Sequence, residues 1–393
     1  MERFDAIVVG AGPAGSTTAH RLASAGARVL LVDKARFPRD KPCGGGLTIR
    51  AVRQLPVSPD PVVEHVVDRM GMRLRYGSRF ERGGRPLVLM TQRIRLDQYL
   101  VEQAVAAGAE FRDGARVADV RAGESDVGMT VDGSPVEAAF LVAADGVNGT
   151  TRKALRLGGD YVLGVAFEGN VAKELVGDRF DGLAEIELGT IPGGYGWVFP
   201  KGDHVNVGVG GWESEGPALR DHLRVLCRAY GIDEESVEGL RGHRLPMRPA
   251  GSVAARGRAL LVGDAAGLVD PLSGDGMYEA FVSSRLAAET ITDFLEGRVQ
   301  SLDGYTEKLS NALALGTAAS WGAKIAFDRY PRLTFALGRA PLAWGPIERL
   351  IRGDIEHPGA QRGPSRIGLK LIERLAKAAG DPGAGYRAEA RTA

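Results

Sequence analysis

Three glycines near the N-terminus have the spacing of a pyrophosphate-binding turn. Gly10, Gly12 and Gly15 form a G-x-G-x-x-G pattern, and Asp33 follows 23 residues after the first of them. In such a turn the first glycine permits the tight bend, the second lets backbone amides approach the phosphates, and the third allows close packing of a helix on a strand. The helix N-terminus favours negative charge, and the acid accepts hydrogen bonds from a ribose hydroxyl. The pattern therefore predicts dinucleotide binding.

Two further acidic residues directly follow predicted apolar strands. Asp145 and Gly146 come after a strand at 140–143, and Asp264 comes after a strand at 259–262. The carboxyl ends of strands in a doubly wound sheet point toward the ligand crevice. Each segment alone is only a strand followed by a turn. Two such strand ends follow the first glycine turn in the chain. We expect all three turns to lie at the same edge of one sheet and to face the same crevice.

A loop rich in glycine and an aromatic strand narrow the chemistry. The segment FPRDKPCGGGL at 37–47 carries three consecutive glycines after Cys43, so it can lie flat against a planar ring and offer backbone amides. Tyr195, Trp197 and Phe199 alternate, so in a strand their side chains share one face and can wall a long apolar substrate. A surface turn and an ordinary core face are the structural alternatives.

Hydrophobic patterning predicts the elements that position these residues. The chain begins with a strand at 6–9, a helix at 17–25 ended by Gly26, and a strand at 28–32 that closes at Asp33. Apolar residues at helical spacing from 96 to 105 predict a second helix, preceded by Arg93 and ended by Gly108. Residues 110–139 alternate as short strands separated by Asp-Gly turns.

These motifs together resemble the geranylgeranyl reductase family of FAD-dependent oxidoreductases over residues 4–300, and above all the bacterial branch that reduces the prenyl side chain of menaquinone. The P-C-G-x-G loop, the Y-x-W-x-F-P element and the downstream N-V-G-x-G carry the resemblance. It implies FAD as the tightly held cofactor, with Asp33 in place of the family's usual Glu and Leu96 in place of a Phe. The implied contacts are Gly10, Gly12, Ala14, Gly15, Asp33, Lys34, Cys43, Gly44, Gly46, Arg93, Val117, Asp145, Gly146, Asp264, Gly274, Gly276 and Met277.

The resemblance also implies an α/β fold with two domains. The Rossmann-type FAD-binding domain, of the aromatic hydroxylase-like (glutathione reductase-type) flavoproteins, would comprise residues 1–61, 91–159 and 246–300. An inserted α+β substrate domain, over a mostly antiparallel sheet, would comprise 62–90 and 160–245, and a C-terminal helical region would comprise 301–393.

The implied reaction is saturation of C=C double bonds in a geranylgeranyl or polyprenyl chain, by hydride from reduced flavin and a proton. The transition state has cation-like character, which aromatic ring faces stabilise without reacting. Tyr195 and Trp197 are the candidates for that role, and Cys43, Tyr195 or a bound water for the proton donor. NADPH or a ferredoxin-like protein would supply the electrons.

Two other functions compete with this hypothesis. A flavin-dependent monooxygenase or halogenase uses a similar flavin domain, but those enzymes do not share the P-C-G-G-G loop, and halogenases carry W-x-W-x-I-P where this chain has Tyr195 and Phe199. A prenyl-lipid carrier without redox activity predicts a degraded flavin site, whereas Gly10, Asp33 and Asp264 are all present.

Composition excludes several other classes. The 393 residues carry a net charge of +1, which argues against nucleic-acid binding, and two cysteines without metal spacing argue against a metal site. No apolar stretch is long enough to cross a membrane. Residues 321–393 carry a net +6, so a basic amphipathic helix there either contacts an anionic bilayer or packs on the protein. We expect a cytoplasmic protein, with contact to the inner face of a membrane as an alternative.

Overall fold

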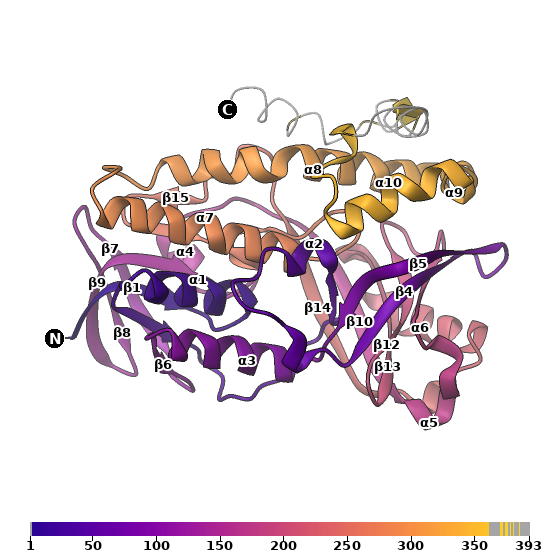
Figure 1. The fold of residues 1–393 in the computed structure, drawn as a ribbon, viewed down its shortest axis with the longest axis horizontal. Coiled ribbons are helices and arrows are strands. Elements are labelled where there is room, and N and C mark those ends of the chain that lie inside the picture. The colour runs from indigo at the N-terminus through magenta and orange to yellow at the C-terminus, as the bar shows by residue number, and fades with distance from the viewer. Residues whose placement is uncertain are drawn as a thin grey trace.

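Two eight-stranded sheets organise the chain in the computed structural model. The structure describes residues 2–360 and, beyond them, residues 370, 371, 374, 375, 378, 380 and 385. The sheets lie next to each other along the long axis of the molecule, and the N-terminal end of β1 lies on the outside (Figure 1).

The first sheet has the order β15-β16-β9-β1-β2-β6, and a hairpin of β7 and β8 joins it through β9. Val9 lies opposite both Val32 and Ala143 in parallel register, and Leu261 lies opposite Ala143 on the far side. The carboxyl ends of these strands therefore meet at one edge of the sheet, as the sequence predicted. The strands are β1 (Glu2–Val9), β2 (Val29–Val32), β6 (Glu110–Arg112), β7 (Val117–Ala122), β8 (Val127–Val131), β9 (Ser134–Ala143), β15 (Ala255–Arg256) and β16 (Ala259–Leu261).

Four long helices accompany this sheet and run side by side in Figure 1. They are α1 (Pro13–Ser24), α3 (Arg93–Ala106), α7 (Met277–Leu295) and α8 (Gly304–Arg329). Helix α1 begins four residues before the predicted start at 17, because Gly12 takes the extended N-cap conformation and Pro13 occupies the first helical position, where its missing N–H is not needed.

The second sheet has the order β14-β10-β13-β12-β11-β4-β5-β3 and is antiparallel except where β11 runs parallel to β4. Its strands are β3 (Gly46–Thr48), β4 (His65–Leu74), β5 (Arg79–Met90), β10 (Val162–Ala172), β11 (Leu183–Leu188), β12 (Tyr195–Pro200), β13 (His204–Trp212) and β14 (Glu238–Met247). Helix α6 (Leu219–Ala229) packs Leu223 and Leu226 on one face of it. The opposite face points toward the first sheet's crevice.

Two helices near the end of the described chain, α9 (Pro331–Arg339) and α10 (Pro341–Arg352), pack on the second sheet. Phe335 and Trp344 are buried, and Arg85 on β5 pairs with Glu348 at 2.8 Å. One side of these helices thus packs on the protein, whereas Leu342 stays 69% exposed. No helix in the described part of the chain is long and apolar enough to span a bilayer. The positions after 360 that carry no description are the remainder of the predicted helical region at 301–393.

The predicted fold class is confirmed: a parallel dinucleotide-binding sheet is joined to a mostly antiparallel one. The division into domains at the stated boundaries stays a prediction. Residues 46–48, inside the segment assigned to the FAD domain, form β3 at the edge of the second sheet. Short elements complete the fold: α2 (Ile49–Val52), α4 (Thr151–Leu155), α5 (Lys173–Val176), and the 3₁₀ helices η1 (Asp60–Val62), η2 (Gly177–Phe180), η3 (Glu213–Ala218), η4 (Glu234–Ser236), η5 (Gly263–Ala266) and η6 (Pro358–Ala360).

Candidate active site

The glycine turn after β1 is packed too tightly for side chains at two of its three positions. Gly10 has a φ of +105°, and a Cβ there would lie 2.3 Å from the Ala144 carbonyl oxygen. A Cβ on Gly15 would lie 1.8 Å from the Gly10 carbonyl oxygen. No side chain caps the N-terminus of α1. Its first N–H groups therefore face the crevice, where they can bind an anion.

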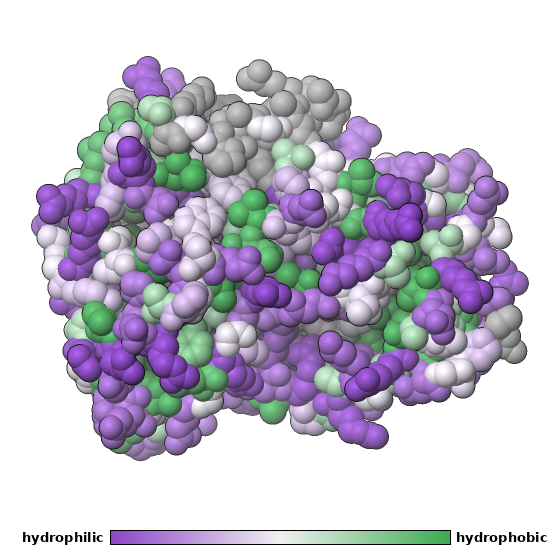
Figure 2. Space-filling model, turned by 180° about the vertical axis from the view of Figure 1, so that it is seen from behind, coloured by the Kyte–Doolittle hydropathy of each residue, from purple (hydrophilic) through white to green (hydrophobic). Residues whose placement is uncertain are grey.

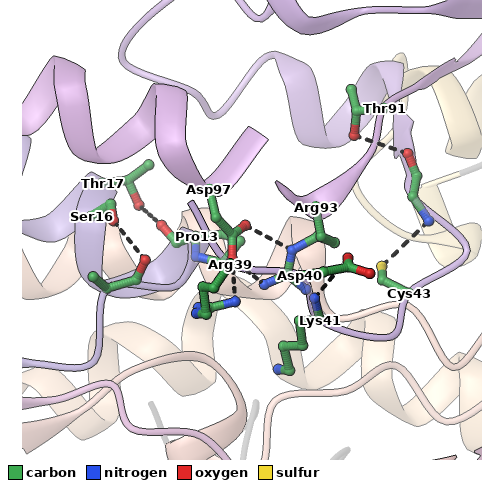
Figure 3. A network of polar contacts seen from close by, with 12 residues as sticks. Pro13, Ser16, Thr17, Arg39, Asp40, Lys41, Cys43, Thr91, Arg93 and Asp97 are labelled. Atoms are coloured by element: carbon green, nitrogen blue, oxygen red, sulfur yellow. Dashed lines mark hydrogen bonds and ion pairs between the residues drawn. The ribbon is translucent and has the colours of Figure 1, made fainter. Parts of the chain in front are cut away.

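Two arginines lie beside this helix end and share one buried carboxylate (Figure 3). Asp97, on α3, accepts two 2.7 Å hydrogen bonds from Arg93 and lies 2.8 Å from Arg39. A Cβ added to Gly12 would lie 3.6 Å from Nη2 of Arg39 and 4.0 Å from Nη2 of Arg93. The pair of guanidinium groups is thus held next to the turn, where a pyrophosphate would need positive charge.

Asp33 fixes the turn from the end of β2. One carboxylate oxygen accepts the Ala11 N–H at 2.8 Å, the other accepts the Ala35 N–H at 2.9 Å, and Arg39 lies 3.9 Å away. The carboxylate also borders the crevice. It is therefore held by backbone donors in an orientation that leaves it exposed to a ribose.

Asp264, after β16, forms a second charged group in the crevice. Its Oδ2 lies 3.3 Å from the Lys41 ammonium and 3.6 Å from Nε2 of His243. Burial alone would raise the pKa of Asp264, but Lys41 and His243 overcome this effect and hold the pKa well below its usual range. Asp264 therefore stays ionised at neutral pH.

The three glycines of the Cys43 loop pack so closely against neighbouring groups that little space is left for side chains. A Cβ on Gly44 would lie 3.0 Å from the Phe199 ring, one on Gly45 would lie 1.7 Å from the Lys201 Nζ, and one on Gly46 would lie 2.8 Å from Val88. No side chain can be accommodated at Gly45 without displacing buried groups. The loop thus presents its backbone and Cys43 to the crevice.

Hydrogen bonds to Glu168 and Thr91 tie this loop to the second sheet, and Lys201 supports Thr91 in turn. The Cys43 N–H donates to Oε1 of Glu168 at 2.6 Å, and the Gly45 carbonyl accepts the Thr91 N–H at 2.8 Å. Lys201 donates to the Thr91 carbonyl at 2.7 Å and is only 3% exposed. Burial lowers the pKa of Lys201 to about 8.

The aromatic residues of β12 do share one face. The Tyr195 and Trp197 rings meet edge to face at 5.9 Å, and those of Trp197 and Phe199 stack at 6.1 Å. The Trp197 Nε1–H donates to Oδ1 of Asn206 at 2.7 Å, which fixes the indole. The Tyr195 hydroxyl donates to the Ser273 carbonyl, and burial raises its pKa. These contacts build a rigid aromatic wall beside the Cys43 loop.

The turn before α7 brings Asp270 and Asp275 to the same crevice. Asp275 accepts the Met277 N–H at 2.8 Å, and within α7 Glu279 lies 3.5 Å from Arg50. Burial raises the pKa of both Asp275 and Glu279. The turn thereby places Gly274, Gly276 and Met277 at the crevice.

A single cavity of about 940 Å³ joins these groups. Of the predicted residues, every one borders it except Gly15, which packs α1 on β1 instead. Those that line the cavity are Gly10, Gly12, Ala14, Asp33, Lys34, Cys43, Gly44, Gly46, Arg93, Val117, Asp145, Gly146, Tyr195, Trp197, Asp264, Gly274, Gly276 and Met277. Beyond the aromatic wall the lining turns apolar, with Met70, Val88, Ala184, Ile186 and Leu245 among its residues.

Several side chains of the site were missed in the sequence. Arg39, Asp97, Glu168, Lys201 and Asn206 come from five separate segments, so no local spacing joins them. One signal was present: Arg93, just before the predicted helix, and Asp97 within it are four residues apart, a spacing that pairs opposite charges on one face once the helix includes both. Among the described residues, no group of three or more His, Cys, Asp or Glu side chains is arranged to hold a metal.

Comparison with known proteins agrees with the geometry. The family model for an FAD binding domain matches residues 3–173. The uncapped helix end, the two arginines and the volume of the cavity fit that cofactor, whose pyrophosphate the α1 N-terminus and the two arginines would hold. The fold and the site therefore define an FAD-dependent oxidoreductase.

Two curated relatives identify the family. The chain is 35% identical over 326 residues to the menaquinone reductase of Mycolicibacterium smegmatis, covering 74% of this chain and 76% of that one. It is 35% identical over 322 residues to digeranylgeranylglycerophospholipid reductase 1 of Methanopyrus kandleri, covering 75% of this chain and 81% of that one. The chain belongs to the geranylgeranyl reductase family of FAD-dependent oxidoreductases.

Solved structures confirm the fold. A geranylgeranyl bacteriochlorophyll reductase-like protein from Thermoplasma acidophilum superposes with a TM-score of 0.76 at 21% identity, covering 97% of each chain. The flavin-dependent brominase Bmp2 also reaches a TM-score of 0.76, at 20% identity, covering 96% of this chain and all of that one. Because the fold serves both chemistries, the reaction has to be argued from the site.

Proposed function

We propose that the protein saturates C=C double bonds in the geranylgeranyl or polyprenyl chain of an isoprenoid lipid or of menaquinone. One observation carries this proposal, and it concerns two parts of one continuous cavity. The polar part, bordered by Gly10, Asp33 and Asp264, would hold FAD and is called the FAD half; the part bordered by Met70, Ile186 and Leu245 is called the apolar half. The two halves join where the Cys43 loop meets Trp197 and Phe199. A double bond at that junction lies beside the cofactor's ring, while the rest of the chain occupies the apolar half.

The residues at the junction suit reduction of an unactivated alkene. Bound FAD, once reduced, supplies the hydride. Trp197 is 7% exposed and held by Asn206, so its ring can stabilise developing positive charge without rearranging. The apolar lining around Ile186 and Leu245 excludes water that would otherwise capture a cation-like centre.

We infer that the reductant, NADPH or a ferredoxin-like protein, meets the flavin only transiently. The sequence holds one glycine turn of the dinucleotide type, at Gly10. The oxidised protein is mixed rapidly with each reductant in turn while the flavin absorbance is recorded. The rate of the absorbance change distinguishes the two candidate reductants. The physiological donor bleaches the flavin at least as fast as the enzyme turns over.

The C-terminal helices suggest where a membrane-dissolved substrate enters. Leu333 and Leu342 are 44% and 69% exposed, and Arg332 and Arg339 are exposed beside them. At the end of the molecule that carries α9, Figure 2 shows hydrophobic side chains beside hydrophilic ones. We propose peripheral contact with an anionic bilayer at this surface. Leu333→Glu/Leu342→Glu should weaken co-sedimentation with anionic vesicles, whereas Leu175→Glu, changed at a 63% exposed site on α5, should not.

An anaerobic single turnover tests the reaction itself. The protein is reduced with dithionite, a geranylgeranyl lipid or menaquinone is added, and flavin reoxidation is followed together with product mass. We expect two hydrogens to be gained by the prenyl chain for each flavin reoxidised. Reoxidation only after oxygen is admitted, with hydroxylated or halogenated product, would instead identify a monooxygenase or halogenase.

A further inference from the structure

Glu168 is a buried carboxyl group at the junction of the two halves of the cavity. It lies on β10, is 8% exposed, and borders the cavity next to the Cys43 loop. Its Oε1 accepts the Cys43 N–H at 2.6 Å, so the carboxyl group is held against the loop that faces the flavin.

The charges around Glu168 come from four neighbouring segments. Lys201, at the end of β12, and Arg241, opposite Glu168 on β14, are the nearby cations. Arg241 is itself paired with Asp40. Cys43 lies on the loop side, and Asn206 of β13 is a polar neighbour of the carboxyl group. His243, also on β14, faces Asp264 instead.

Burial dominates over these neighbours. It raises the pKa of Glu168, although the Cys43 N–H and the two cations lower it in part. A carboxyl group in this environment holds a proton at a pH where an exposed glutamate has lost it. The same combination of burial and a raised pKa is how enzymes tune a glutamate for acid catalysis.

Three other groups at the cavity are less suited to give up a proton, and Asp275, whose pKa burial also raises, lies at the turn before α7, where it accepts the Met277 N–H. The Tyr195 hydroxyl donates its proton to the Ser273 carbonyl, and burial raises the pKa of that phenol above its ordinary value. Asp264 is ionised beside Lys41. The Cys43 sulfur accepts the Gly45 N–H at 3.4 Å.

We propose that Glu168 is the general acid that protonates the alkene at the Cys43 loop. The Glu168 carboxyl group would give its proton to one alkene carbon while the other carbon would receive the hydride that reduced FAD supplies, and the products would be a saturated C–C bond, oxidised FAD and the Glu168 carboxylate. Water restores the proton before the next turnover. This assignment rests on the proposed prenyl reduction.

Glu168→Gln tests the assignment because its amide oxygen can still accept the Cys43 N–H. We expect FAD affinity and the flavin spectrum to stay within twofold of the original protein. The single-turnover rate of prenyl reduction should fall by about 100-fold or more, the usual contribution of a general acid. Glu238→Gln, an exposed substitution on β14, is the matched control and should leave the rate unchanged.

Two further readouts separate acid catalysis from loop positioning. The single-turnover rate of the original protein should fall as pH rises through the pKa of Glu168, and Glu168→Asp should keep a falling limb that Glu168→Gln lacks. Infrared spectra of the FAD-free protein, recorded over a series of pH values, should contain a protonated-carboxyl band that persists to higher pH than the band of an exposed glutamate, and Glu168→Gln should remove it. The infrared readout holds even if one variant binds FAD poorly.

The proposal is overturned if Glu168→Gln reduces the prenyl chain within twofold of the original rate, or if the infrared band is absent. A general failure of prenyl reduction in the original protein contradicts the proposed function instead, and it leaves the infrared result as the independent test of the protonated carboxyl group.

Discussion

The two halves of the cavity are built on different physical grounds. In the FAD half, charges are paired and backbone groups are aimed: Asp97 holds Arg39 and Arg93, and Asp264 is held by Lys41. In the apolar half, Met70 and Ile186 define the shape of the cavity but offer no hydrogen bonds or charges that would orient a ligand. A cofactor that binds in one fixed position is held well by such preorganised polar groups. A flexible prenyl chain is bound instead by an apolar cavity of sufficient volume.

This contrast predicts that polar substitutions in the FAD half disturb the fold itself. Asp97→Asn removes the charge that compensates two guanidinium groups, one of them fully inside the protein. Breaking a buried pair from one side costs about 4 kcal/mol. Urea unfolding should show this loss, together with weaker FAD binding.

Asp221→Asn is the control for the loss of Asp97. Asp221 pairs with Arg224 at 2.8 Å, but its side chain is 76% exposed. The free energy of unfolding should change by less than about 0.5 kcal/mol. Equal losses in the two variants would show that Asp97 is an ordinary surface charge.

Gly15→Ala tests whether backbone packing, rather than charge, supports the turn. The added Cβ would lie 1.8 Å from the Gly10 carbonyl oxygen, so the backbone has to move. We expect a loss of about 3 kcal/mol in the free energy of unfolding, and purified protein without the yellow colour of FAD. Gly316→Ala, in α8 with no atom near its Cβ, should be neutral or slightly stabilising. Full FAD content in Gly15→Ala would contradict this account.

Two buried lysines extend the comparison: Lys201 lies behind the Cys43 loop, and Lys324 borders the cavity at its distant end. Burial lowers the pKa of both Lys201 and Lys324 to about 8. An unfolded lysine titrates near 10.4, so between pH 8 and 10 the unfolded chain binds more protons and the free energy of unfolding rises with pH. The expected rise is about 2 kcal/mol for each lysine.

Single Lys→Met variants measure these rises by urea unfolding at pH 8 and pH 10. Lys201→Met and Lys324→Met should each lose its own share of the rise. Only Lys201→Met should also change the flavin spectrum, because Lys201 lies under Gly45 whereas Lys324 donates to the Gly193 carbonyl at the distant end. A rise of the same size in all three proteins would disprove the assigned titrations.

The same contrast explains what could be predicted from the sequence. The FAD half uses backbone geometry at short spacing, so Gly10, Gly15 and Asp33 were recognisable from their pattern alone. Glu168 and Lys201 are 33 residues apart in the sequence. They become neighbours only when strands β10 and β12 take their places in the second sheet. The apolar half has no motif, because any apolar residue of suitable size fills such a wall and alternation predicts only a buried face.

The smallest expected effect concerns the shape of the apolar half. Ile186→Trp adds side-chain volume to the lining of the apolar half. Part of the prenyl chain can then no longer be accommodated there, whereas the lining of the FAD half is unchanged. We expect the KM for the prenyl substrate to rise about tenfold, equivalent to about 1.4 kcal/mol, with FAD affinity unchanged. Val225→Trp, at a 45% exposed position of α6, is the control. If Ile186→Trp released FAD instead, the cofactor and the chain would share one binding region, and the distinction between the two halves would have to be abandoned.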